Sequence, residues 1–168
     1  WLCAPKGTSF LFVKENLQKN MIPQTVSWGQ DGDDPGPSQF LMNFQWQGTR
    51  DMSSFLSIPA AIKFVKNAHW KNRQLTSRKI INEVSKQLQL LFNTSPLSVG
   101  GDWIGQMVSH QLPKNVPPNL KDTLWKDYSI EVPIFEWKNE KYIRVSVHGY
   151  NDRLDIKKLI YVLGKQLL

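Results

Sequence analysis

The feature that most constrains the fold is a long helical pattern in the middle of the chain. Apolar residues recur at near-helical spacing between Trp70 and Phe92, which predicts one long amphipathic helix. We expect Pro96 and the glycine pair at residues 100–101 to end it. The apolar residues of this pattern are Leu75, Ile80, Ile81, Val84, Leu88 and Leu91.

Short strands and helices are predicted after this helix. We expect a strand at residues 106–112, a short helix begun by proline at 118–126, and a hairpin of 129–135 and 141–147. A last helix follows, with Asn151 as its cap. Its apolar face carries Ile156, Leu159, Ile160, Leu163 and Leu167. The order is that of an α+β module.

The region before the long helix mixes apolar runs with turn residues. Residues 7–13 (GTSFLFV) predict a buried strand, and a second short strand is expected at 24–28. Residues 29–38 (GQDGDDPGPS) predict a surface loop. Residues 40–50 lead into a further helix, whose candidate caps are Ser53, Ser54 and Ser57. The composition changes near residues 67–72, where we expect the boundary between a first unit and the α+β module.

The net charge of +7 could indicate a nucleic-acid partner. Most of the excess lies between Lys63 and Lys86, where Glu83 is the single acidic residue. These cations are spread around the predicted helix and lack the interleaved aromatic residues of a base-stacking surface. We therefore favour a solvated helix face, and expect no nucleic-acid partner.

The single cysteine, Cys3, excludes an intrachain disulfide and a Cys-rich zinc site. It fits a reducing, cytoplasmic compartment. No apolar run approaches the roughly 20 residues that span a bilayer, so no membrane association is expected. Scattered histidines and an acidic run without calcium-loop spacing (Asp31, Asp33, Asp34) predict no metal site.

Arg144 is the first candidate for binding chemistry. In the strand YIRVSV, alternation places Ile143 and Val145 on one face and Arg144 on the other, away from the core. A guanidinium can hold a carboxylate through two parallel hydrogen bonds. A surface salt bridge is the alternative role. His148, just beyond the strand, could line the same pocket or simply be packed.

A second candidate lies at Gly48 and Thr49. Glycine permits close backbone approach, and the threonine offers an N–H and a hydroxyl to an anion. Placed before a helix, this pair could hold a phosphate, or could be an ordinary turn and helix cap. The neighbouring charges, Arg50 and Asp51, indicate little by themselves.

Together these segments resemble the class V aminotransferase family of pyridoxal-phosphate (PLP) enzymes, in its isopenicillin N epimerase-like branch. The start, WLCAPKGTSFLFV, resembles the stretch directly after the family's cofactor-binding lysine. QGTRDMSSFLSIPAAIKFV resembles the branch's Gly-Thr-Arg-Asp segment and its following helix. IRVSVHGYNDRLDIKKL resembles the C-terminal Arg-x-Ser, Tyr-Asn and Asp-Ile-x-x-Leu pattern.

The resemblance implies a fold class and a division into domains. The fold would be α/β, the C-terminal part of a PLP-dependent transferase of fold type I. Residues 1–70 would end the large cofactor domain, and residues 71–168 would form the small α+β domain.

The resemblance also implies roles for the candidate residues. Gly48 and Thr49 would bind the PLP phosphate, across a homodimer interface from the neighbouring subunit. Arg144 would bind the carboxylate of an amino-acid substrate, with Arg50 and His148 as further substrate contacts. The Schiff-base lysine would precede Trp1, so no catalytic residue is expected in this chain, which by itself would be an inactive C-terminal half.

The activity within the family stays open. Family desulfurases carry a cysteine on a loop shortly before the carboxylate-binding arginine, and no cysteine lies between Trp103 and Arg144. A desulfurase is therefore disfavoured. An epimerase or racemase, a C–S lyase and an aminotransferase remain, beside a non-catalytic basic interaction or nucleic-acid-binding module and a degenerate scaffold of the family.

Overall fold

The computed structural model of the chain describes residues 1–33, 36–67, 69–98 and 103–167. It divides into two compact units, Trp1–Val65 and Lys66–Leu168, and we describe each by itself. None of the helices within the described residues is both long and apolar enough to cross a membrane.

The second unit is built on a three-stranded antiparallel sheet. Its strands are β1 (Met107–Gln111), β2 (Ile134–Trp137) and β3 (Glu140–Ser146), in the order β1-β3-β2. The predicted strand at 106–112 and the second strand of the hairpin are confirmed, but the first strand of the hairpin begins at Ile134 and not at residue 129, and it extends to Trp137. The hairpin turns at Lys138 and Asn139, which both have positive φ, as tight two-residue turns require.

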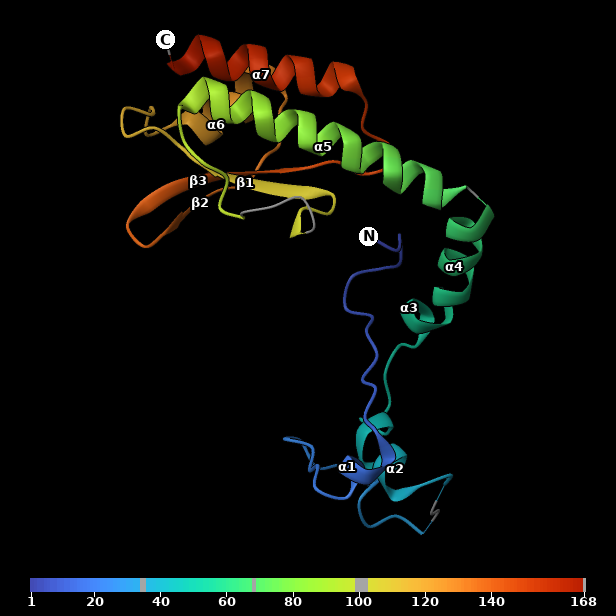
Figure 1. The fold of residues 1–168 in the computed structure, drawn as a ribbon. Helices are drawn as coiled ribbons and strands as arrows, with labels where there is room; N and C mark the ends of the chain where they lie inside the picture. Colours follow the sequence, from blue (N-terminus) through green and yellow to red (C-terminus); the bar gives the residue numbers. More distant parts are fainter. Residues whose placement is uncertain (34–35, 68, 99–102, 168) are drawn as a thin grey trace. The chain divides into compact units, whose positions relative to one another are not determined.

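Three helices lie on one side of this sheet (Figure 1). They are α5 (Trp70–Phe92), α6 (Leu120–Tyr128) and α7 (Arg153–Leu167), so the long helix has the bounds that its periodicity predicts. The core forms where they meet the sheet. Its fully buried side chains include Ile81, Leu88, Leu124, Ile143 and Leu163.

The predicted cap of α7 is wrong by one residue. Asp152, and not Asn151, accepts hydrogen bonds from the backbone N–H groups of Leu154 (2.7 Å) and Asp155 (3.1 Å). Asp155 in turn accepts from the N–H of Asp152, which completes a reciprocal cap. The side chain of Asn151 instead accepts from the N–H of His148.

The first unit is mostly irregular chain with short helices. These are α1 (Glu15–Gln18), α2 (Gln39–Gln45), α3 (Ser53–Leu56) and α4 (Ile58–Asn67), whose last two residues fall in the second unit. Helix α2 was not predicted, although Ser38 caps it by accepting from the N–H of Leu41.

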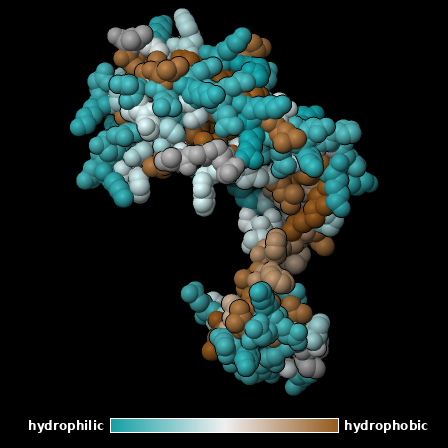
Figure 2. Space-filling view, in the orientation of Figure 1, coloured by the Kyte–Doolittle hydropathy of each residue, from teal (hydrophilic) through white to brown (hydrophobic). Residues whose placement is uncertain are grey.

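The two strands predicted in the first unit are wrong. Neither residues 7–13 nor 24–28 form a strand, and Phe10 and Phe12 are 91% and 78% exposed. A strand needs a partner for its backbone hydrogen bonds, and none of the described residues pairs with either segment. Figure 2 shows further hydrophobic side chains at the surface, over α3 and α4.

The candidate caps before α4 have other roles. Helix α3 begins at Ser53, whose N–H and hydroxyl donate to the carboxylate of Asp51 at 2.8 and 2.9 Å. Ser57 stands directly before α4, but its hydroxyl donates to the carbonyl of Ser54. The described part of the loop at 29–38 contains no helix before Gln39 and no strand, as predicted, and Asp34 of its acidic run lies outside the described residues.

Candidate functional site

Gly48 and Thr49 form an open turn between α2 and α3. Gly48 has φ +86°, a conformation that favours glycine, and apart from its own and its two chain neighbours' atoms nothing described lies within 4 Å of the position a Cβ would occupy. The hydroxyl of Thr49 and both backbone N–H groups bond to none of the residues that the structure describes. The turn therefore presents three unengaged donors around a backbone that a ligand can approach closely.

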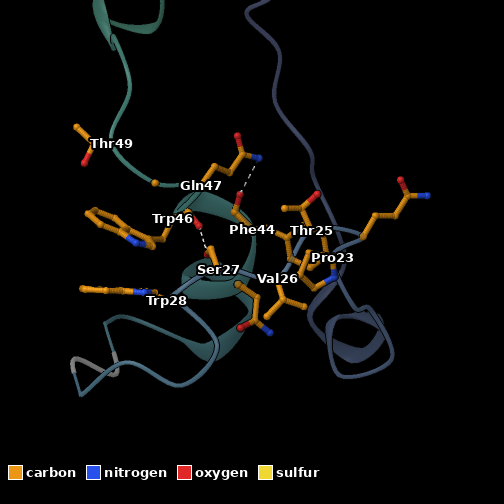
Figure 3. Close-up of a pocket in the computed structure, with 12 residues that line it drawn as sticks. Pro23, Thr25, Val26, Ser27, Trp28, Phe44, Trp46, Gln47 and Thr49 are labelled. Atoms are coloured by element: carbon orange, nitrogen blue, oxygen red, sulfur yellow. Dashed lines mark hydrogen bonds between the residues drawn. The ribbon is translucent and has the colours of Figure 1, made fainter.

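This turn borders a cavity of about 780 Å³ that the sequence did not reveal. Figure 3 shows the indole rings of Trp28 and Trp46 on the same side of the cavity as Thr49. The hydroxyl of Ser27 donates to the carbonyl of Trp46 and joins the two segments that form the wall. The cavity is thus lined by both aromatic and polar side chains, with hydrogen-bond donors at Thr49.

Arg50 lies beside the turn but does not line this cavity. Its guanidinium stands over the ring of Phe55, 4.9 Å from the centroid, and donates to the side-chain oxygen of Gln47. It borders a second cavity of about 680 Å³, together with Met52 and Phe55. Asp51, next in sequence, is engaged by Ser53, whose hydrogen bonds lower the pKa of its carboxyl.

Arg144 projects from β3 on the face of the sheet opposite the core. Its neighbours Ile143 and Val145 are buried in the core, whereas Arg144 is exposed, so the predicted alternation is confirmed. Its backbone N–H donates to the carbonyl of Pro133, which fixes its place in the hairpin. The guanidinium makes no hydrogen bond or ion pair within the described residues, so it is available to a carboxylate.

His148 lies just after β3 and is buried between two aromatic rings. Its ring centroid is 4.8 Å from that of Trp70 and 4.6 Å from that of Tyr150. The structure thus places the histidine ring in tilted contact with one aromatic ring from the start of α5 and one from the loop before α7. Its role as a substrate contact stays a prediction.

The predicted site residues fall into two groups. Gly48, Thr49 and Arg50 lie in the first unit, and Arg144 and His148 lie in the second. Among the described residues there is no cluster of acidic, histidine or cysteine side chains that could hold a metal ion. The side chains that the sequence failed to indicate are the tryptophans of the cavity wall, because nothing in the sequence places residues 23–28 beside α2.

Solved structures of other proteins have the same fold as this chain. A cysteine desulfurase from Thermococcus onnurineus NA1 matches 93% of this chain with TM-score 0.71 and 16% identity, over 42% of its own length. The cystine C–S lyase C-DES, in complex with its product cysteine persulfide, matches 99% with TM-score 0.72 and 16% identity, over 44% of its length. A C-DES variant holds glycine covalently linked to its PLP cofactor. The predicted fold, the C-terminal part of a PLP-dependent protein of fold type I, is confirmed.

Comparison of the amino-acid sequence with curated proteins adds relatives that carry one name. Isopenicillin N epimerase from Amycolatopsis lactamdurans is 29% identical over 175 residues, which cover 97% of this chain and 44% of that protein. The enzyme of the same name from Streptomyces clavuligerus is 26% identical over 177 residues, covering 95% and 43%. No protein-family model matches the chain.

The resemblance to the C-terminal half of class V PLP enzymes, in their isopenicillin N epimerase-like branch, is thereby confirmed. The chain spans less than half the length of the curated relatives it matches. The likeness to desulfurases, at 16% identity or less, establishes the fold and not the activity.

Proposed function

We propose that this chain supplies the phosphate-binding turn and the carboxylate-binding arginine of a PLP-dependent enzyme that acts on an amino acid. The observation that carries the proposal is the turn at Gly48 and Thr49, with its positive φ and three unengaged donors. These donors suit a phosphate, which accepts several short hydrogen bonds at once. An epimerase or racemase, a C–S lyase and an aminotransferase are all compatible with these residues.

Bound PLP would supply an electron sink for the electrons of a bond broken at the α-carbon of the substrate. The residues of this chain hold the cofactor phosphate and orient the substrate. The N–H groups of Gly48 and Thr49 and the threonine hydroxyl bind phosphate oxygens. Because the turn exposes backbone and no bulky side chain, the phosphate can approach without displacing other atoms.

Arg144 orients the substrate. Its two parallel N–H donors bind both oxygens of the α-carboxylate, and so fix the direction of the bonds at the neighbouring α-carbon. Because the guanidinium has no competing anion among the described residues, the substrate does not have to displace an existing ion pair. We assign Arg50 and His148 as further substrate contacts.

The proposal includes an arrangement of domains and subunits. Residues 1–70 end the large cofactor domain and residues 71–168 form the small domain. The enzyme works as a homodimer in which Gly48 and Thr49 reach the cofactor of the neighbouring subunit. Sedimentation equilibrium tests the homodimer. We expect the mass of a dimer, and the mass of a monomer at all concentrations would contradict the proposal.

Phosphorus NMR of pyridoxamine 5′-phosphate tests the phosphate site. This ligand carries the phosphate but no aldehyde, so it does not react with surface lysines. We expect its resonance to shift on addition of the 168-residue chain. Thr49→Val should weaken binding about fivefold, as expected for one lost hydrogen bond of about 1 kcal/mol.

Thr25→Val is the matched control, because Thr25 lines the same cavity outside the turn. It should leave the affinity unchanged. Equal loss in both variants, or equal binding of pyridoxamine without its phosphate, would refute a phosphate site at Gly48 and Thr49.

A further inference from the structure

Three aromatic side chains lie together on the sheet face that carries Arg144. The ring of Phe135 stacks on Tyr142 with centroids 5.7 Å apart, and Trp137 meets Tyr142 edge-on at 5.9 Å. We call these three residues the aromatic cluster. Phe135 and Tyr142 are paired across β2 and β3, and Trp137 is paired with Glu140.

Burial shows that the aromatic cluster is separate from the core. Tyr142 is only 7% exposed, yet it is not among the residues of the hydrophobic core, which lies on the other side of the sheet. Strand alternation gives the same result, since Ile143 and Val145 of β3 belong to the core and Tyr142 and Arg144 do not. Trp137 keeps 45% of its surface exposed, and the ammonium of Lys138 stands over its ring, 4.5 Å from the centroid, so the cluster presents aromatic surface to solvent beside a cation.

The cluster stands directly beside Arg144. Tyr142 and Arg144 are two residues apart on one face of β3, so their Cα atoms are about 7 Å apart. That is comparable to the length of an amino acid from its carboxylate to the end of its side chain. A ligand whose carboxylate pairs with Arg144 can therefore lay its side chain along the cluster, on the partly exposed ring of Phe135, since Tyr142 is itself buried.

We propose that the aromatic cluster is the specificity surface for the substrate side chain, and that the substrate is an amino acid with an apolar or aromatic side chain. The inference rests on the proposed role of Arg144 in binding the carboxylate. An apolar side chain placed on these rings would remove exposed aromatic surface from water, which is favourable. A charged side chain in the same place would lose part of its own hydration, which costs free energy.

Single-stranded nucleic acid also stacks on aromatic side chains beside cations, and Arg144 and Lys138 stand beside these rings, but the larger group of cations on α5 does not. The cationic side chains of the second unit that gather between Lys71 and Lys86 stand on α5. That helix packs on the core face of the sheet, opposite the aromatic cluster (Figure 1). A nucleic-acid backbone that followed these cations would lie away from the rings.

Calorimetric titration of the 168-residue chain with glycine and L-phenylalanine tests the inference. We expect L-phenylalanine to bind about fivefold more tightly than glycine, as one aromatic contact predicts. Phe135→Ala should remove this preference and leave the glycine affinity within about twofold. Trp137→Ala, at the exposed end of the cluster, should reduce the preference without disturbing the fold. Trp125→Ala changes an exposed tryptophan on α6, and as the control it should change neither affinity.

The outcomes separate the two proposals. If Arg144→Ala weakens both ligands but the wild-type chain shows no preference between them, the specificity surface is refuted and the carboxylate site stands. Equal loss of both ligands in Phe135→Ala and Trp137→Ala likewise refutes it, since the cluster would then be only structural. If neither amino acid binds, or Arg144→Ala changes nothing, the carboxylate site itself is refuted. Binding of single-stranded oligothymidine that Trp137→Ala abolishes would identify a nucleic-acid surface instead.

Discussion

The buried histidine of β1 makes the stability of the second unit depend on pH. His110 is fully buried, and its Nε2 lies 3.0 Å from the hydroxyl of Ser85 on α5. Its Nδ1 is also buried and has no partner within the described structure. Protonation would therefore place a charge and an unsatisfied N–H donor in the core. Burial lowers the pKa of His110 from 6.5 to about 4.

The pKa of His110 differs between the folded and the unfolded chain, and this difference sets how stability changes with pH. Between pH 6.5 and 4 the unfolded chain binds a proton that the folded chain does not, so stability is complete above pH 6.5 and falls as the pH falls. A difference of about 2.5 pKa units corresponds to about 3 kcal/mol in full, of which about 2 kcal/mol is lost by pH 5.

Urea unfolding at pH 7, 6 and 5, followed by circular dichroism, measures this loss. The free energy of unfolding of the wild-type chain should fall by about 2 kcal/mol more between pH 7 and pH 5 than that of His110→Leu, which cannot titrate at this position. His69→Gln is the control, because His69 is an exposed histidine of the same unit. It should keep the wild-type slope.

If the free energy of unfolding falls equally between pH 7 and pH 5 in the wild type and in His110→Leu, the reasoning is refuted. An NMR titration of the His110 ring gives a direct second reading. A midpoint near 6.5 in the folded state would show that the ring reaches solvent or finds a second partner, and that its burial does not set its protonation.

Three further predictions concern stability. Ile143→Ala removes a fully buried side chain at the centre of the sheet and should cost about 2–5 kcal/mol in urea unfolding, whereas Arg144→Ala on the opposite face should change stability by less than about 0.5 kcal/mol. Asp152→Ala removes the cap of α7 and should cost about 1 kcal/mol, measured against Asp127→Ala, which lies outside that cap. Gly48→Val forces a β-branched residue into φ +86° and should cost about 1–2 kcal/mol while also weakening the pyridoxamine phosphate complex. A cost for Gly48→Val of less than about 0.5 kcal/mol, the usual range for a surface substitution, would contradict the strain argument.

The second unit could be predicted from the sequence because its signals are local. The periodicity of Trp70–Phe92 and the alternation of Glu140–Ser146 are satisfied by contacts within the unit, so both patterns give the correct elements. The cap of α7 was missed by one residue because Asn151 and Asp152 are both good caps. Only the geometry shows that Asn151 is already engaged by His148.

The first unit could not be predicted in the same way. Residues 7–13 have strand composition, but composition does not supply the neighbouring strand that a ladder needs. Gly48 and Thr49 could be identified as an anion-binding turn from residue type, and the positive φ of Gly48 agrees with that choice. The aromatic cluster could not, because Phe135 and Trp137 meet Tyr142 only through the register of the hairpin.

We propose that Gly48 and Thr49 hold a cofactor phosphate and that Arg144 holds a substrate carboxylate, so that different residues bind the two ligands. Titration of wild type, Thr49→Val and Arg144→Ala with pyridoxamine 5′-phosphate and with L-phenylalanine separates these two roles. We predict that Thr49→Val weakens only the phosphate ligand and that Arg144→Ala weakens only the amino acid. Equal loss of both ligands in either variant, or no loss in either, would contradict the account.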